Sequence, residues 1–147
     1  MEKERSMEKD ALKDRILDVI KGAHLATLAT ISEGKPAARY MVIHQDDGLN
    51  LYTVTFANSR KVKQISQNNN VYVLIGGEPK NYQAPYVNIQ ATAGVLSDPE
   101  TKKRCWSESL KSYFSGPEDP NYVVIKITSQ VIEYMAPNAH HPETYTV

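Results

Sequence analysis

The fold of this chain is decided by residues 24–56, which read HLATLATISEGKPAARYMVIHQDDGLNLYTVTF. The segments 24–31, 36–44 and 49–56 have the period of two and the residue types of strands, and the stretches between them, 32–35 and 45–48, are rich in turn residues. Period-two alternation is typical of strands with one buried face, and Gly, Asp and Ser favour tight turns. The stretch therefore predicts three strands joined by tight turns, an antiparallel meander.

The sequence on either side of this meander adds helices and further strands. Four apolar residues fall at helical spacing and Gly22 supplies a C-terminal stop, which predicts an amphipathic first helix. The four residues are Leu12, Ile16, Leu17 and Ile20. Helices are expected at 7–22, 57–67 and 97–114, and strands at 71–75, 86–96 and 122–128, with 131–135 extending the last strand or pairing with it.

Six or so antiparallel strands with a few helices at their margins favour a mainly β, α+β architecture. Closing the sheet into a complete or partial barrel removes the exposed strand edges that promote aggregation. At 147 residues the chain has the size of one compact domain. We therefore expect a single domain over 1–147, with loose tails at 1–9 and 137–147. The periodicity predicts this architecture but no function.

The composition restricts the cellular compartment and the classes of partner that we expect for this protein. Seventeen Lys and Arg balance seventeen Asp and Glu, so the overall field attracts neither nucleic acid nor an anionic membrane. Cys105 is the only cysteine, which excludes an internal disulfide, a thiolate zinc site and a dithiol redox motif. No stretch has the apolar length of a signal peptide or a membrane span. We expect a cytoplasmic protein with no nucleic-acid or membrane partner.

The stretch with most chemical information is 52–61, which reads YTVTFANSRK. A predicted strand there ends in hydroxyl residues, and a predicted helix begins with Ser59, Arg60 and Lys61. Backbone N–H groups at a helix start, a hydroxyl and two cations together suit a phosphate. A serine that only caps the helix, followed by solvated cations, is the commoner use of this pattern. The local sequence leaves both interpretations open.

The other chemistry-bearing residues are less informative. Arg39 lies inside a predicted strand, where it points either to solvent or to a ligand. The four histidines have no metal-ligand spacing, and no hydrolase triad or Gly-rich phosphate loop is present, so we expect neither a metal site nor a hydrolase. Trp106, Leu110 and Phe114 recur at four-residue intervals, which is first of all the pattern of a packing face.

Taken in order, several segments resemble a known family. LATLAT at 25–30, GKP at 34–36, RYM at 39–41, LYT at 51–53, and Lys61 with Ile65, Asn70 and Val71 are similar to the FMN-binding split-barrel proteins related to pyridoxamine-phosphate oxidase. The later run FSGPEDPNYVV at 114–124 resembles the general stress protein 26 type. The resemblance covers residues 10–135, and its specificity lies in the ordered series of segments.

The resemblance implies a six-stranded antiparallel split β-barrel that works as a homodimer, with FMN in a groove between two identical barrels. The residues that would bind the cofactor are Arg39, Tyr40, Met41 and Val42 along the flavin, Tyr52 and Thr53 near its ribityl chain, Ser59, Arg60 and Lys61 at its phosphate, and Trp106 from the third helix. Under this resemblance, phosphate binding becomes the preferred interpretation of the helix start.

Departures from the vitamin B6 oxidases argue against pyridoxamine-phosphate oxidase activity itself. His44 stands where the matching strand of those oxidases ends in a lysine that contacts the substrate. Tyr86 stands where they place a glutamine on the flavin, so we do not assign that role to Gln90. The chain also stops before the segment that completes their substrate pocket. Arg60 agrees with the oxidases better than with the stress branch.

Four functions are consistent with the sequence. The first is a flavin-dependent oxidoreductase acting on an unknown small molecule, in which the flavin reacts and the protein positions it, so that no catalytic residue is assigned. The second is a non-catalytic flavin-binding or flavin-buffering protein of a stress response. The third keeps the barrel but uses deazaflavin or haem, because a fold does not fix a function. The last is an interaction module with no ligand.

Overall fold

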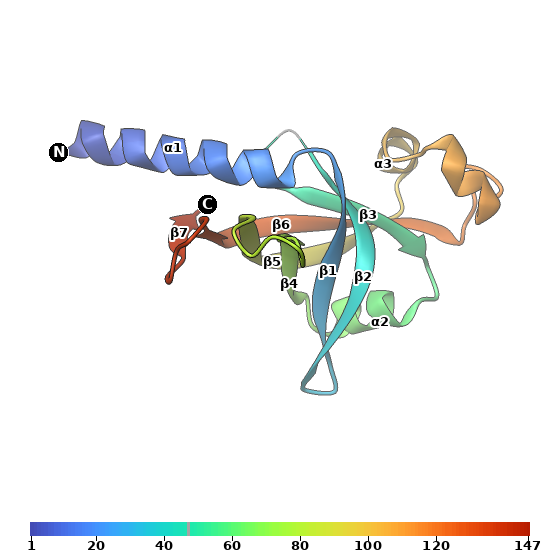
Figure 1. Cartoon of the computed structure of the whole chain (residues 1–147). Helices are drawn as coiled ribbons and strands as arrows, with labels where there is room; N and C mark the ends of the chain where they lie inside the picture. The colour runs from blue at the N-terminus through green and yellow to red at the C-terminus, as the bar shows by residue number, and fades with distance from the viewer. Residues whose placement is uncertain (47) are drawn as a thin grey trace.

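A closed barrel is the centre of the computed structural model, which describes residues 1–46 and 48–147 (Figure 1). Its strands are β1 (Ala23–Ser32), β2 (Lys35–Gln45), β3 (Leu51–Phe56), β4 (Asn70–Gly76), β5 (Tyr86–Leu96) and β6 (Tyr122–Met135). They lie in the order β3-β2-β1-β4-β5-β6, and antiparallel pairing of β3 with β6 closes the sheet. The predicted barrel is confirmed. The predicted turn at 45–48 includes Asp47, which lies outside the described residues.

The β1–β2 hairpin fixes which side chains face the barrel interior. Its two strands pair without interruption from Ala23↔His44 to Ser32↔Lys35. Glu33 and Gly34 connect them with φ values of 51° and 77°, the two positive values that a tight two-residue hairpin turn needs. Because side chains alternate along a strand, this register turns even-numbered β1 residues and odd-numbered β2 residues inward. Leu28 and Ile43 are accordingly fully buried.

Two of the predicted helices are present with shifted bounds: both differ in their start, and the first also ends two residues before the predicted end at 22. α1 (Glu2–Ile20) begins at Glu2, so residues 2–9, expected to be a loose tail, continue it as exposed helix. Leu12, Ile16 and Ile20 are its buried residues, and Leu17, the fourth predicted apolar position, is partly buried against the same core. α2 (Arg60–Gln67) begins after Ser59, three residues later than the predicted start at 57. In Figure 1 it lies near the barrel end that carries the β1–β2 turn.

The predicted single helix at 97–114 is wrong. The segment forms a short α3 (Pro99–Arg104) and a separate 3-10 helix, η1 (Glu108–Ser112). Asp98 starts α3 by accepting a hydrogen bond from the Thr101 N–H at 3.0 Å. The helix breaks at Ser107, whose backbone is extended. The break follows from packing, because the Trp106 ring meets the buried Tyr122 ring edge-on with the two ring centroids 5.4 Å apart. We call residues 99–114 the α3–η1 segment.

The C-terminal residues are not a loose tail throughout. β7 (Glu143–Thr146) pairs antiparallel with residues 131–134 of β6 beyond the barrel. The Tyr145 ring is buried, with the Lys9 ammonium 5.0 Å from its centroid. Arg15 donates to Glu143 at 3.0 Å, so α1 and β7 hold each other. The sequence signal is weak here because four residues cannot bury a face alone; the support comes from α1 and β6.

The main core fills the barrel and continues under α1. It consists of inward side chains of the strands together with Ile16, Ile20 and Ile65 from the helices. A second, smaller cluster lies between β3, β6 and the α3–η1 segment, and contains Tyr52, Phe114, Tyr122 and Val124. The second cluster anchors the α3–η1 segment to the outside of the barrel.

One outer side of the sheet carries exposed apolar side chains, which we call the outer face. Strand register places its members on one side: Leu25 lies opposite Val42, and Thr27 lies opposite both Tyr40 and Leu74. Tyr40 is 74% exposed and Leu25 is 71% exposed. The outer face comprises Leu25, Tyr40, Val42, Tyr72, Leu74 and Tyr86.

Candidate functional site

The barrel opens between β2 and β3. These strands pair at only two positions, His44↔Tyr52 and Gln45↔Leu51, whereas β3 pairs with β6 along its whole length. Beyond Tyr52 the Thr53 hydroxyl donates to the Val42 carbonyl at 2.8 Å, a side-chain contact across the gap. The facing strand edges present backbone N–H and C=O groups that no described strand pairs. Such groups are ready partners for a ligand or water.

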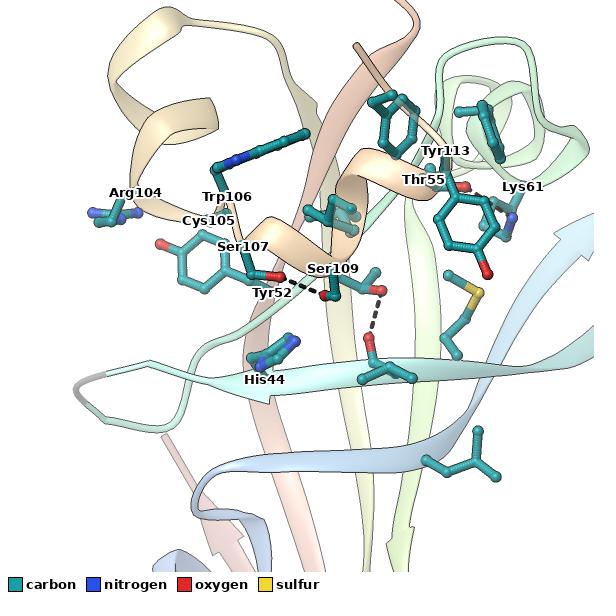
Figure 2. Close-up of a pocket in the computed structure, with 18 of the residues that line it drawn as sticks. His44, Tyr52, Thr55, Lys61, Arg104, Cys105, Trp106, Ser107, Ser109 and Tyr113 are labelled. Carbon is teal, nitrogen blue, oxygen red and sulfur yellow. Dashed lines mark hydrogen bonds between the residues drawn. The ribbon is translucent and has the colours of Figure 1, made fainter. Parts of the chain in front are cut away.

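A pocket of about 840 Å³ occupies this opening, a size within the range of small-molecule sites. Its floor is formed by β2 and β3, and the α3–η1 segment forms the opposite wall (Figure 2). Leu25, Tyr40 and Val42 belong both to the pocket wall and to the outer face. The pocket therefore opens at the edge of an exposed apolar surface.

Aromatic packing fixes the wall opposite the strands. Phe114 and Tyr122 are buried with ring centroids 5.1 Å apart, and Phe56 lies 4.7 Å from Phe114. The Tyr122 hydroxyl donates to the Lys102 carbonyl at 2.9 Å, which ties α3 to β6. Trp106 packs on Tyr122 and also lines the pocket. The wall is therefore largely apolar and is supported by the packed rings behind it, which suits a ligand with a flat ring system.

One end of the pocket is positively charged. Figure 2 shows Lys61 and Thr55 together there, with Lys61 Nζ donating to Thr55 Oγ1 at 3.1 Å. Thr55 Oγ1 lies 3.5 Å from Ser59 Oγ, so the hydroxyl at the end of β3 connects the two residues at the start of α2. Ser59 does not cap α2 through its side chain. Its hydroxyl is directed to this polar end instead.

Arg39 lies behind this end, inside the barrel mouth. As an odd-numbered β2 residue it points inward, and it does not line the pocket itself. Its Nη1 donates to Thr30 Oγ1 at 2.8 Å and to the Leu28 carbonyl at 3.2 Å, and its Nη2 donates to Gln64 Oε1 at 2.8 Å. Arg39 therefore ties β2 to β1 and α2.

Three cationic side chains, those of Arg39, Arg60 and Lys61, lie near the start of α2. Burial and the nearby charges of Arg39 and Arg60 lower the pKa of Lys61, and burial and Arg60 lower the pKa of Arg39. Both shifts mean that the positive charges are held close together at a cost. An anion bound among them would relieve that cost, and a phosphate is the anion whose oxygens suit several such donors.

The other end of the pocket is polar but mixed in charge. Arg104 lies over the Tyr52 ring with its guanidinium carbon 5.2 Å from the centroid, and Ser107 and Ser109 hydroxyls are 2.7 Å apart. His44 lies across from them in Figure 2. Cys105 also lines the pocket, and burial raises the pKa of its thiol. The thiol therefore stays protonated at neutral pH and is a poor nucleophile.

The structure brings most of the sequence-predicted site residues together and separates a few. The pocket wall includes Tyr40, Met41, Val42, Tyr52, Thr53, Lys61 and Trp106. Arg39, Ser59 and Arg60 lie outside this wall, although their charges and hydroxyl surround the Lys61 end. The predicted packing role of Trp106, Leu110 and Phe114 is confirmed, and the same three residues also face the pocket.

Sequence reasoning missed two kinds of residue. Gln64 accepts hydrogen bonds from the site, and no motif marks it in the sequence. Arg104, Ser107 and Ser109 join the pocket only because the predicted helix breaks before η1. The available signal was the two serines flanking Glu108, which are poor in helix interiors and common at helix starts.

Comparison with known proteins gives the same architecture and order of segments. The family model for pyridoxamine 5'-phosphate oxidase matches residues 12–136. This chain belongs to that family. It is 34% identical over 129 residues to general stress protein 26 of Bacillus subtilis (strain 168), covering 88% of this chain and 91% of the relative. The crystal structure of general stress protein 26 from Bacillus anthracis str. Sterne has a TM-score of 0.79 and 33% identity, covering 92% of this chain and 98% of that one.

A barrel of this fold also occurs in a protein that is named for heme binding. A heme binding protein from Mycobacterium smegmatis has a TM-score of 0.70 and 15% identity, over 91% of this chain and 56% of that one. At this identity the likeness concerns the fold alone.

Among the described residues of our chain, no helix is long and apolar enough to cross a membrane.

Proposed function

We propose that the protein binds FMN in the β2–β3 pocket and is a flavin-dependent oxidoreductase that acts on a small molecule. The observation that carries the proposal is the cluster of Arg39, Arg60 and Lys61 at one end of a largely apolar pocket of about 840 Å³. A phosphate at one end and a flat ring system along the wall are the two features such a pocket selects.

The residues present fit this cofactor in three ways. Lys61, Thr55 and Ser59 would hold the phosphate, with the charges of Arg39 and Arg60 behind them. The unpaired edges of β2 and β3, near Val42 and Thr53, offer backbone groups to the polar part of the ring system. The Trp106 side of the pocket offers an apolar wall.

A bound flavin supplies the hydride and electron chemistry, and the protein positions it and excludes water. We assign no residue of this chain as an acid or base. His44 differs from the lysine of the vitamin B6 oxidases, which supports a substrate other than theirs. The alternative without turnover, a flavin-buffering stress protein, uses the same pocket.

A deazaflavin or haem cofactor is the other alternative. His44 is an imidazole on the pocket wall, and a relative with this fold is named as a heme binding protein. The cation cluster favours a ligand with one terminal phosphate. The absorption spectrum of the purified protein distinguishes haem from flavin directly.

We further propose that the protein is a cytoplasmic homodimer that closes the pocket with a second copy of the chain. Leu25 and Tyr40 are more than two-thirds exposed on the outer face and also line the pocket. Covering the outer face with a second copy would bury these side chains and shield the flavin site in the same contact. The single Cys105 agrees with a reducing compartment.

Turnover is tested by NADPH or NADH oxidation with added FMN. The oxidoreductase proposal predicts a rate that requires FMN and protein together and falls in Lys61→Ala, because this variant loses the phosphate contact. Lys63→Ala is the control, since Lys63 is exposed on the same helix and does not line the pocket. FMN binding without any protein-dependent rate with either nucleotide would favour the buffering function.

A further inference from the structure

One amide oxygen connects α2 to two strands of the barrel. Gln64 lies on α2, one turn after Lys61, and its Oε1 accepts from Thr30 Oγ1 at 2.7 Å and from Arg39 Nη2 at 2.8 Å. Thr30 is buried on β1 and Arg39 is half-buried on β2. The position of the Arg39 guanidinium therefore depends on the Gln64 side chain.

All the hydrogen-bond acceptors of Arg39 in the described structure are neutral. Besides Gln64 they are the Thr30 hydroxyl and the carbonyls of Leu28 and Ala37. Among the described residues, Arg39, Arg60 and Lys61 have no carboxylate within 4.0 Å. Charges that are taken out of water are usually paired with an opposite charge, and Arg39 is partly removed from water. Here the protein supplies the bonds but leaves the charge uncompensated.

We propose that Gln64 sets the anion affinity of the site. Its carbonyl oxygen positions the Arg39 guanidinium. Because the amide is neutral, the positive charges of Arg39, Arg60 and Lys61 remain available to bind a phosphate monoester. The inference rests on the proposed function, since it concerns the phosphate end of the same pocket. A glutamate at this position would accept the same two hydrogen bonds and would also neutralise Arg39. The amide therefore positions Arg39 without neutralising the positive charge of the site.

A purely structural role for Gln64 makes a different prediction. If Gln64 only ties α2 to the barrel, Gln64→Glu keeps both acceptor positions and should leave ligand binding unchanged. Gln64→Met removes the acceptor and should lower the melting temperature in either case. The discriminating variant is therefore Gln64→Glu, because it separates the hydrogen bonds from the charge.

The experiment uses the full chain and three probes: FMN, riboflavin, which lacks the phosphate, and inorganic phosphate. The control is Gln67→Glu, which makes the same charge change at an exposed position on the same helix. For Gln64→Glu we expect an unchanged or higher melting temperature without ligand, FMN binding weaker by about tenfold or more, and riboflavin binding within about twofold of wild type. The rise in melting temperature caused by phosphate at constant ionic strength should be lost. Gln67→Glu should behave as wild type.

The outcomes separate this inference from the proposed cofactor. Wild-type FMN affinity in Gln64→Glu, or equal losses for FMN and riboflavin, would overturn the role of Gln64 while leaving FMN binding in place. If wild type binds no flavin but phosphate raises its melting temperature and Gln64→Glu abolishes the rise, the cofactor is wrong and the role of Gln64 stands. No response of wild type to any of the three probes overturns both.

Discussion

At the scale of single residues, Tyr122 couples stability to alkaline pH. Its ring is fully buried, its hydroxyl donates to the Lys102 carbonyl at 2.9 Å, and burial raises its pKa from 10.0 to about 12. The folded pKa lies above the unfolded pKa, so the contribution is fully present below pH 10. It is lost as pH rises toward 12, because the unfolded chain then releases the proton first.

We therefore predict that Tyr122→Phe lowers the free energy of unfolding at pH 8 by about 1 kcal/mol, since the Lys102 carbonyl loses its donor. Between pH 10 and pH 11.5 the variant should lose less stability than wild type. Urea unfolding across this range measures the difference, with Tyr82→Phe as the control because Tyr82 is 97% exposed. Parallel pH profiles for wild type and Tyr122→Phe would show that Tyr122 does not titrate as described.

At the scale of elements, the α3–η1 segment depends on Phe114. This ring is 5% exposed and lies between Phe56 and Tyr122. Phe114→Ala should lower the free energy of unfolding by about 3 kcal/mol, the usual cost of emptying such a site. FMN affinity should fall as well, because Leu110 and Phe114 line the pocket. Denaturant unfolding with and without FMN measures both effects.

The neighbouring Tyr113 provides the control for this prediction. Tyr113 also lines the pocket, but it is 66% exposed. Because little of its side chain is buried, Tyr113→Ala should change the free energy of unfolding by no more than about 0.5 kcal/mol. If Phe114→Ala and Tyr113→Ala are equally stable, the second cluster does not anchor the segment.

The strands were predictable from the sequence because each has its own alternation and turn residues, as β1 and β2 show. The α3–η1 break was not, because it depends on how Trp106 meets Tyr122 across the chain. β7 was missed for the same reason: burial of Tyr145 depends on α1. In the site, the hydroxyls near the end of β3 and Lys61 at the start of α2 were predictable from local pattern. The inward direction of Arg39 required the register of β2, and the β2–β3 opening required the closed barrel.

At the scale of the whole molecule, the homodimer that we propose would assemble through the outer face. Val42 and Leu74 project from this face and are 53% and 42% exposed. Replacing both by lysine would place charges in the proposed interface, where they would lack partners. We predict that Val42→Lys combined with Leu74→Lys converts the dimer to a monomer in analytical ultracentrifugation and weakens FMN binding.

A lysine elsewhere on the surface should have neither effect. Tyr82→Lys is the control, because Tyr82 lies in the loop between β4 and β5 and outside the outer face. A double variant that sediments as wild type does, or a wild-type protein that is monomeric at micromolar concentration with FMN bound, would contradict assembly through this face.

We propose that the Lys61 end of the β2–β3 pocket binds the phosphate of FMN, and a paired titration with FMN and riboflavin separates the phosphate from the ring system. We expect saturable FMN binding to wild type, about 10- to 100-fold weaker FMN binding to Lys61→Ala, and little change in riboflavin binding. Lys63→Ala should bind FMN as wild type does. FMN does not bind its phosphate at Lys61 if wild type shows no saturable binding at tens of micromolar FMN, an affinity of roughly −6 kcal/mol, or if Lys61→Ala and wild type have equal FMN affinity.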